Sequence, residues 1–203
     1  MINAVGRNIP DELLKNGKEV YKGNNYRDGK YYVKASPRVQ IADKSKQSKV
    51  LGSIREAILK CGIKDGMTLS FHHHFRDGDY VVNMVMAEIV ALGIKDITIA
   101  ASSLGSAHDP VAEYIEQGIV TGLQTSGIRG RIGEVVSQGK LKTPAILRSH
   151  GGRVRAIEEG DVHIDVAFIG TPTCDEYGNA RGKGGRSDCG VLSYSVVDAK
   201  YAD

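Results

Sequence analysis

The chain has 203 residues, which is enough for one large domain with a substantial buried core. Hydrophobic residues make up 41% of the sequence and charged residues 25%, a composition typical of globular proteins and not of disordered chains. The net charge of +3 is too small to favour nucleic acid as a partner. The cysteines, Cys61, Cys174 and Cys189, are too scattered for a disulfide framework or a structural metal site, so we expect reduced thiols.

No membrane attachment is expected from the sequence. It contains no run of about 18 apolar residues that would predict a transmembrane helix. Residues 1–10 lack the basic region and the apolar region of a signal peptide. We therefore expect a cytoplasmic protein with no membrane partner.

Residues 1–46 are polar and irregular, with lysine, arginine and tyrosine residues scattered along them. They fit either an N-terminal arm that lies over the surface or over a partner, or a partly disordered lead-in. From Ser48 onward the hydrophobic pattern becomes regular. We therefore divide the chain into an arm, residues 1–46, and an α/β domain, residues 47–203.

Strands and helices are predicted to alternate along the rest of the chain. Apolar residues at helical spacing predict helices between Ser48 and Gly62 and over residues 79–92, 109–117, 128–138 and 154–159. Short apolar runs predict strands over residues 67–71, 96–101, 119–123, 144–148, 162–169 and 190–197. This alternation predicts a mostly parallel sheet with helices on both faces.

The last predicted strand is followed by residues 198–203, which begin an element that the sequence does not finish. A doubly wound sheet that stopped there would have an incomplete edge. We therefore expect the α/β domain to be truncated at its C-terminal end and to belong to a longer protein. Ligands of such sheets bind at the carboxyl ends of the strands, so the segments that follow the strands are the candidates for a functional site.

The segment after the first predicted strand carries His72, His73, His74 and Arg76. Three consecutive histidines cannot all face one metal ion, because neighbouring strand residues point to opposite faces, and no further ligands are spaced for a metal. The imidazoles suit hydrogen bonding to a carbonyl oxygen, and Arg76 suits pairing with a substrate carboxylate. The alternative is a strand end with one buried histidine and two solvated ones.

The segment after the fourth predicted strand is the second candidate. Its paired glycines would let the backbone approach a ligand closely, and its arginines and histidine add positive charge and hydrogen-bond donors. The candidate substrate-binding residues there are Arg148, Ser149, His150, Gly151, Gly152 and Arg153. The alternative is an ordinary strand-to-helix turn.

The remaining strand ends give weaker signals. Residues 102–109 and 124–131 each precede a helix and suit either anion binding or helix capping. After the fifth strand, Asp175 and Glu176 suit a general base or a turn cap, and Cys174 has no base beside it that would support a nucleophile. No GxGxxG motif follows the first strand and no Walker motif is present, which disfavours a nicotinamide dehydrogenase and a P-loop enzyme.

Residues 165–179, with their Asp-Val, apolar, Pro, Asp-Glu and Gly-Asn pattern, resemble a segment of CoA-transferase subunits. Further segments are similar to the alpha subunit of citrate lyase, namely residues 3–10, 70–76, 125–130 and 149–153. The histidine segment is the most specific, because common CoA-transferases have a Gly-Gly-Phe type of turn at that strand end. The resemblance extends over essentially the whole chain and implies a CoA-transferase (NagB/RpiA-like) fold, with this chain as the N-terminal half of the subunit.

The resemblance also implies an activity. Citrate lyase alpha subunits exchange acetyl for citryl on a carrier thiol, which gives citryl carrier and acetate. No tightly bound cofactor is implied, because CoA or a CoA-like prosthetic group on the carrier protein is the substrate. The implied partners are the beta (lyase) subunit and the gamma (acyl carrier) subunit, within an oligomer.

In that activity a citrate carboxylate attacks the acetyl thioester, and the released thiolate attacks the citryl carbonyl of the mixed anhydride. We therefore assign Arg76, Arg148 and Arg153 to substrate charge and His72, His73 and His74 to the oxyanions, as a mechanistic hypothesis, and Glu176 is a weaker catalytic candidate. Two alternatives stay open. One is a CoA-transferase for acetate or 3-oxoacids, which the histidines and Arg76 count against, and the other is a non-catalytic binding domain.

Overall fold

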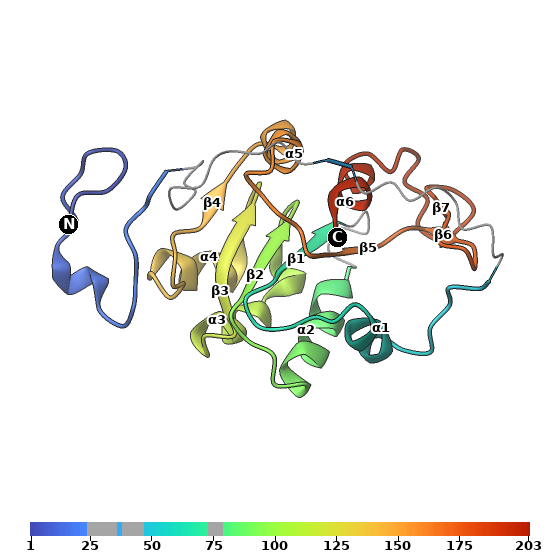
Figure 1. The fold of residues 1–203 in the computed structure, drawn as a ribbon, viewed down its shortest axis with the longest axis horizontal. Coiled ribbons are helices and arrows are strands. Elements are labelled where there is room, and N and C mark those ends of the chain that lie inside the picture. The colour runs from blue at the N-terminus through green and yellow to red at the C-terminus, as the bar shows by residue number, and fades with distance from the viewer. Residues whose placement is uncertain (24–35, 38–46, 73–78) are drawn as a thin grey trace.

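The computed structural model describes residues 1–23, 36–37, 47–72 and 79–203. Within these ranges five strands form one sheet in the order β4-β3-β2-β1-β5, and every pairing in it is parallel. The strands are β1 (Thr68–His72), β2 (Ile97–Ala101), β3 (Val120–Thr125), β4 (Ile146–Leu147) and β5 (Val166–Ile169). Figure 1 shows them side by side, with α5 lying at the edge to which they point. The predicted parallel sheet is confirmed.

Helices cover both faces of this sheet. They are α1 (Ile54–Lys60), α2 (Val81–Ala91), α3 (Val111–Glu116), α4 (Gly130–Ser137), α5 (His150–Glu158) and α6 (Ser195–Tyr201), with 3₁₀ helices at Asp11–Leu14 and Ser106–His108. The steps from β1 to β4 run in one direction, so right-handed crossovers put α2, α3 and α4 on one face. The return to β5 puts α5 on the opposite face, against α6. None of the described helices is long and apolar enough to cross a membrane.

The core consists of two apolar clusters, one on each face of the sheet. The larger contains Leu69 and Phe71 of β1 and the inner sides of α1 to α4. The smaller lies under α5 and α6 and includes Ile157. Because successive strand residues point to opposite faces, Ser70 and His72 of β1 face α5 and α6 instead of the larger cluster.

A buried ion pair joins α5 and α6 to the sheet. Arg153 of α5 and Asp198 of α6 meet through two hydrogen bonds, Nη1 to Oδ1 at 2.7 Å and Nη2 to Oδ2 at 2.9 Å. Arg153 Nη2 also donates to Ser70 Oγ at 2.9 Å and to the Ala100 carbonyl at 3.1 Å, while Ser70 Oγ donates to Asp198 Oδ2 at 2.6 Å. The arginine is 4% exposed and the aspartate 0%, so two helices and two strands share one desolvated charge pair.

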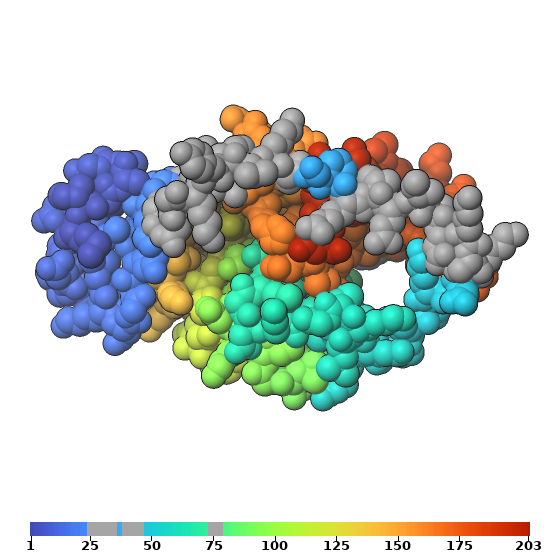
Figure 2. All heavy atoms as spheres, in the orientation of Figure 1, coloured from blue at the N-terminus to red at the C-terminus, as the bar shows by residue number. Residues whose placement is uncertain are grey.

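Residues 1–23 lie beside β4, at the end of the molecule where the N-terminus is marked in Figure 1, and Figure 2 shows them in blue at that end. The Glu19 N–H donates to the Lys142 carbonyl at 3.3 Å, which fastens this segment to the chain that leads into β4. A hollow of about 570 Å³ lies between the two. The rest of the predicted arm, residues 24–35 and 38–46, falls outside the described residues.

The prediction of a strand over residues 190–197 is wrong. That segment begins as a loop and then turns into α6, with Tyr194 at its N-terminal boundary. β-branched residues such as Val196 favour a strand, but the ion pair with Arg153 requires Asp198 on a helix that packs across β1. The only other described strands are β6 (Thr173–Cys174) and β7 (Ala180–Arg181), an antiparallel pair that Figure 1 shows beyond β5.

Replacing Asp198 with alanine should lower the free energy of unfolding by about 3–5 kcal/mol, because it leaves the Arg153 charge buried without its partner. Urea unfolding followed by circular dichroism measures this. The matched control is Glu88→Ala, which breaks the exposed ion pair of Arg55 and Glu88 at 3.0 Å and should cost about 0–1 kcal/mol. Equal losses in the two variants would contradict the structural importance of the buried pair.

Candidate functional site

The carboxyl end of β1 and the start of α5 bring two predicted histidines to the same edge of the sheet. His72 ends β1 and is 4% exposed, whereas His150 begins α5, the helix that follows β4. The ring of Tyr194 contacts both, since its centroid lies 5.8 Å from that of His72 and 5.1 Å from that of His150. We call His72, His150 and Tyr194 the ring cluster.

Serine residues that follow β2 and β3 lie beside the ring cluster. Ser126 Oγ is 3.5 Å from Nε2 of His150. The Ser126 hydroxyl donates to the Ser102 carbonyl, and the Ser126 N–H donates to the same carbonyl at 3.0 Å. The segments after β2, β3 and β4 therefore meet at this edge, as expected for the carboxyl ends of parallel strands.

The first turn of α5 carries the paired glycines. Ser149 caps the helix, because its Oγ accepts a hydrogen bond from the Gly152 N–H at 3.1 Å. A Cβ atom at Gly152 would lie 3.1 Å from that Oγ, whereas a Cβ at Gly151 would meet no heavy atom within 4 Å. The backbone at Gly151 is therefore open to close approach, and that at Gly152 is occupied by the cap.

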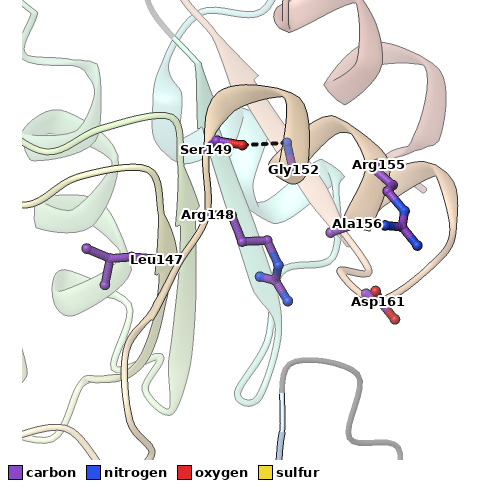
Figure 3. A pocket seen from close by; sticks show the side chains of 7 residues that line it. All are labelled: Leu147, Arg148, Ser149, Gly152, Arg155, Ala156 and Asp161. Carbon is purple, nitrogen blue, oxygen red and sulfur yellow. Dashed lines mark hydrogen bonds between the residues drawn. The ribbon is translucent and has the colours of Figure 1, made fainter.

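Arg148 lies at the edge of a hollow of about 300 Å³ next to this turn (Figure 3). The figure shows the side chains of Arg148, Arg155 and Asp161 around the opening, with the Ser149 cap above them. Nη1 of Arg148 donates to Oε1 of Gln124 at 2.6 Å, which fixes the guanidinium against β3. Burial lowers the pKa of Arg148 from its ordinary value, and the charge of Asp161 opposes this shift. An arginine keeps its charge at neutral pH, so Arg148 and Arg155 bring two positive charges to the hollow and Asp161 brings one negative charge.

Arg153 does not line this hollow. It is buried, and its Nη1 and Nη2 atoms are held by Asp198, Ser70 and a carbonyl of β2. The sequence predicted Arg153 as a substrate-binding residue and gave no sign of its buried partner, which is 45 positions away. Val196 and Val197 favoured a strand in this segment, and no local pattern marked the helix that carries Asp198.

Glu176 lies apart from the ring cluster, as an exposed residue in the turn between β6 and β7. Its carbonyl accepts a hydrogen bond from the Lys49 N–H at 2.7 Å. The neighbouring Asp175 caps the turn, and the hydrogen bonds from the Asn179 side chain and backbone lower the pKa of that carboxyl. Three further candidates, His73, His74 and Arg76, lie outside the described residues.

One group in the described part of the chain has the spacing of metal ligands. His163, Asp165 and Asp203 place one ligand atom each within 4.8 Å of one another. They are at the amino-terminal end of β5, the opposite edge from His72. His163 Nε2 is 3.2 Å from Asp203 Oδ2 and 3.6 Å from Asp165 Oδ1, which is also the geometry of an ordinary ion pair.

Comparison with known proteins decides the family. A family model described as citrate lyase, alpha subunit, matches residues 47–203. The chain belongs to the citrate lyase alpha subunit family. Curated citrate lyase alpha chains agree with this assignment, with 48% identity over 176 residues for Haemophilus influenzae and 50% over 161 residues for Escherichia coli K12. The resemblance predicted from the sequence is thereby confirmed.

The chain covers only part of its relatives in this family. The matches take in 87% and 79% of this chain but 35% and 32% of the curated relatives, so it spans about one third of their length and not the predicted half. A crystal structure of the putative citrate lyase alpha subunit of Streptococcus mutans in complex with citrate is 49% identical, with a TM-score of 0.79. That similarity covers 99% of this chain and 39% of the other.

Replacing Gly151 with alanine should raise the free energy of unfolding by about 0.5–1 kcal/mol, because alanine favours a helix and the space beside Gly151 is open. Gly152→Ala is the matched control. It should gain less or lose stability, since its new Cβ presses on the Ser149 cap. Chemical denaturation of both variants measures the difference, and a destabilised Gly151→Ala would show that this backbone is not open.

Proposed function

We propose that this chain belongs to a protein that exchanges acetyl for citryl on the thiol of an acyl carrier, giving citryl carrier and acetate. The observation that carries the proposal is the family match, together with 48% and 50% identity to citrate lyase alpha chains. The Streptococcus mutans relative was crystallised with citrate, which supports a tricarboxylate as the substrate. The carrier thiol would come from CoA or a CoA-like prosthetic group.

The proposed exchange proceeds in two acyl transfers. A citrate carboxylate oxygen attacks the acetyl thioester carbonyl, and the carbon–sulfur bond breaks to release the thiolate and a mixed anhydride. The thiolate then attacks the citryl carbonyl of the anhydride, and acetate leaves with the electrons of the broken carbon–oxygen bond. Each transfer passes through an oxyanion, so the site must supply positive charge for citrate and donors for two oxyanions.

Arg148 is the proposed cation for a citrate carboxylate. Gln124 holds it at the edge of the hollow shown in Figure 3, half-buried, where a charge pair is stronger than in free solution. The cap by Ser149 and the open backbone at Gly151 leave room for a ligand beside it. Arg76 stays a candidate for a second carboxylate on the strength of its sequence position alone.

The oxyanion donors are proposed to be imidazoles of the ring cluster. His72 and His150 come from different elements, but both rings pack against one neighbour, Tyr194, at the carboxyl edge of the sheet. His73 and His74, which follow His72 directly, remain candidates for the same role. We assign Glu176 no covalent step, because its turn lies with the β6–β7 pair and not at the ring cluster.

The proposal extends to partners only through the family. A chain that acts on a carrier thiol needs the gamma (acyl carrier) subunit, and a citryl thioester needs the beta (lyase) subunit to cleave it. Both are therefore proposed partners in an oligomer, and sequence beyond this chain's share of its relatives would complete the alpha subunit. Residues 1–46, which the sequence predicts to be an arm, are the proposed contact for these partners.

The test is acetyl-to-citryl exchange by the full natural polypeptide, with acetyl-CoA or acetyl carrier as donor and acetate release as the signal. His72→Leu removes a proposed oxyanion donor and should lower kcat about 100-fold. His163→Leu is the matched control, because His163 lies at the opposite edge of the sheet, and it should leave kcat within about twofold. A wild-type protein without exchange activity would overturn the proposed function, and equal rates for wild type and His72→Leu would remove His72 from it.

A further inference from the structure

Three elements each contribute one residue to the buried ion-pair network and one to the ring cluster. The pairs are Ser70 and His72 on β1, Arg153 and His150 on α5, and Asp198 and Tyr194 at α6. The first member of each pair is buried in the network of hydrogen bonds around Arg153. The second member lies toward the carboxyl edge of the sheet. The three residues of the ion-pair network thus form a lower layer, and the three residues of the ring cluster form an upper layer nearer the carboxyl edge.

The sequence spacing keeps these two layers in register. Ser70 and His72 are two apart on a strand, so they share a face and lie about 6–7 Å apart along it. Arg153 and His150 are three apart on a helix, and Asp198 and Tyr194 are four apart, so each pair also shares a face about one turn apart. The distance along each element from its lower-layer residue to its upper-layer residue is thus similar on β1, α5 and α6.

Tyr194 is the residue that connects the upper layer. Its ring meets His72 edge-on, with 73° between the planes, and meets His150 at a tilt of 34°. One imidazole belongs to β1 and the other to the helix that follows β4, and β2 and β3 separate these two strands in the sheet order. The lower layer places Tyr194 between them, because Asp198, one helical turn away, is locked to Arg153 through two hydrogen bonds.

We propose that Tyr194 is a positioning residue, whose ring fixes the orientation of the His72 and His150 imidazoles, and that the Arg153–Asp198 ion pair holds Tyr194 in place. This inference rests on the proposed function and names residues that support the same site. Donors to an oxyanion must be held within about 0.5 Å of their working position. Loosening the imidazoles therefore lowers kcat more than it changes the KM for citrate.

Tyr194→Leu and Tyr194→Phe separate the ring from the hydroxyl group. In the full natural polypeptide, Tyr194→Leu should lower kcat at least tenfold, change the KM for citrate less than threefold and shift the pH profile of kcat. Tyr194→Phe keeps the ring and should restore kcat to within about twofold of wild type. Tyr177→Leu, at an exposed tyrosine of the β6–β7 turn, is the matched control and should leave kcat and its pH profile unchanged.

Histidine NMR tests the same inference without relying on activity. With ¹³C-labelled histidine, the titration curves of the His72 and His150 imidazoles should both change in Tyr194→Leu and stay as in wild type in Tyr194→Phe. Arg153→Lys keeps the buried charge but loses the paired hydrogen bonds, so it should change both curves in the same direction as Tyr194→Leu.

The outcomes separate this inference from the proposed function. Unchanged histidine titrations in Tyr194→Leu would overturn the positioning role, even in an active enzyme. So would a Tyr194→Phe variant as impaired as Tyr194→Leu, because the hydroxyl group would then be the essential part. A wild-type protein that shows no acyl exchange would overturn the proposed function, while the NMR titrations would still decide the role of Tyr194.

Discussion

The arrangement of this domain depends on one buried ion pair, that of Arg153 and Asp198. Burying two charges costs several kcal/mol of solvation for each, and the cost is offset only when geometry and hydrogen bonding are complete. Here both carboxylate oxygens are bonded, and the guanidinium also reaches a serine of β1 and a carbonyl of β2. The pair therefore fixes how α5 and α6 sit on the sheet, and with them the residues one turn further along.

Much of the fold was predictable because its causes are local. Short apolar runs alternate with segments of helical periodicity along the chain. That pattern alone predicted the parallel sheet, the helices on both of its faces and the strand ends as the location of a functional site. The prediction failed over residues 190–197, where valines favour a strand and the deciding partner of Asp198 is 45 positions away. No local pattern reveals a buried partner at that distance, and the tertiary contact overrode the propensity.

The site was predictable in part for the same reason. His72 and His150 stood out because histidines and glycines crowd two strand ends, and both reach the same edge. Arg153 is in the same segment, but its side chain is buried and bonds to Asp198. Its position one helical turn after His150 decides this, and the composition of the segment does not reveal it. Tyr194 was not predicted as a site residue, because it lies in the segment 190–197 that was predicted to be a strand. The family itself was visible in short motifs, whereas the length of the relatives was not.

In the proposed function, the carboxyl edge of this sheet, and not its opposite edge, receives citrate. The most direct measurement is a citrate titration of the full natural polypeptide, followed through the imidazole signals of His72, His150 and His163. We predict that the signals of His72 and His150 shift together and saturate at the same citrate concentration, while the signal of His163 does not shift. Saturable changes at His163 alone, or none at His72 and His150, would contradict it.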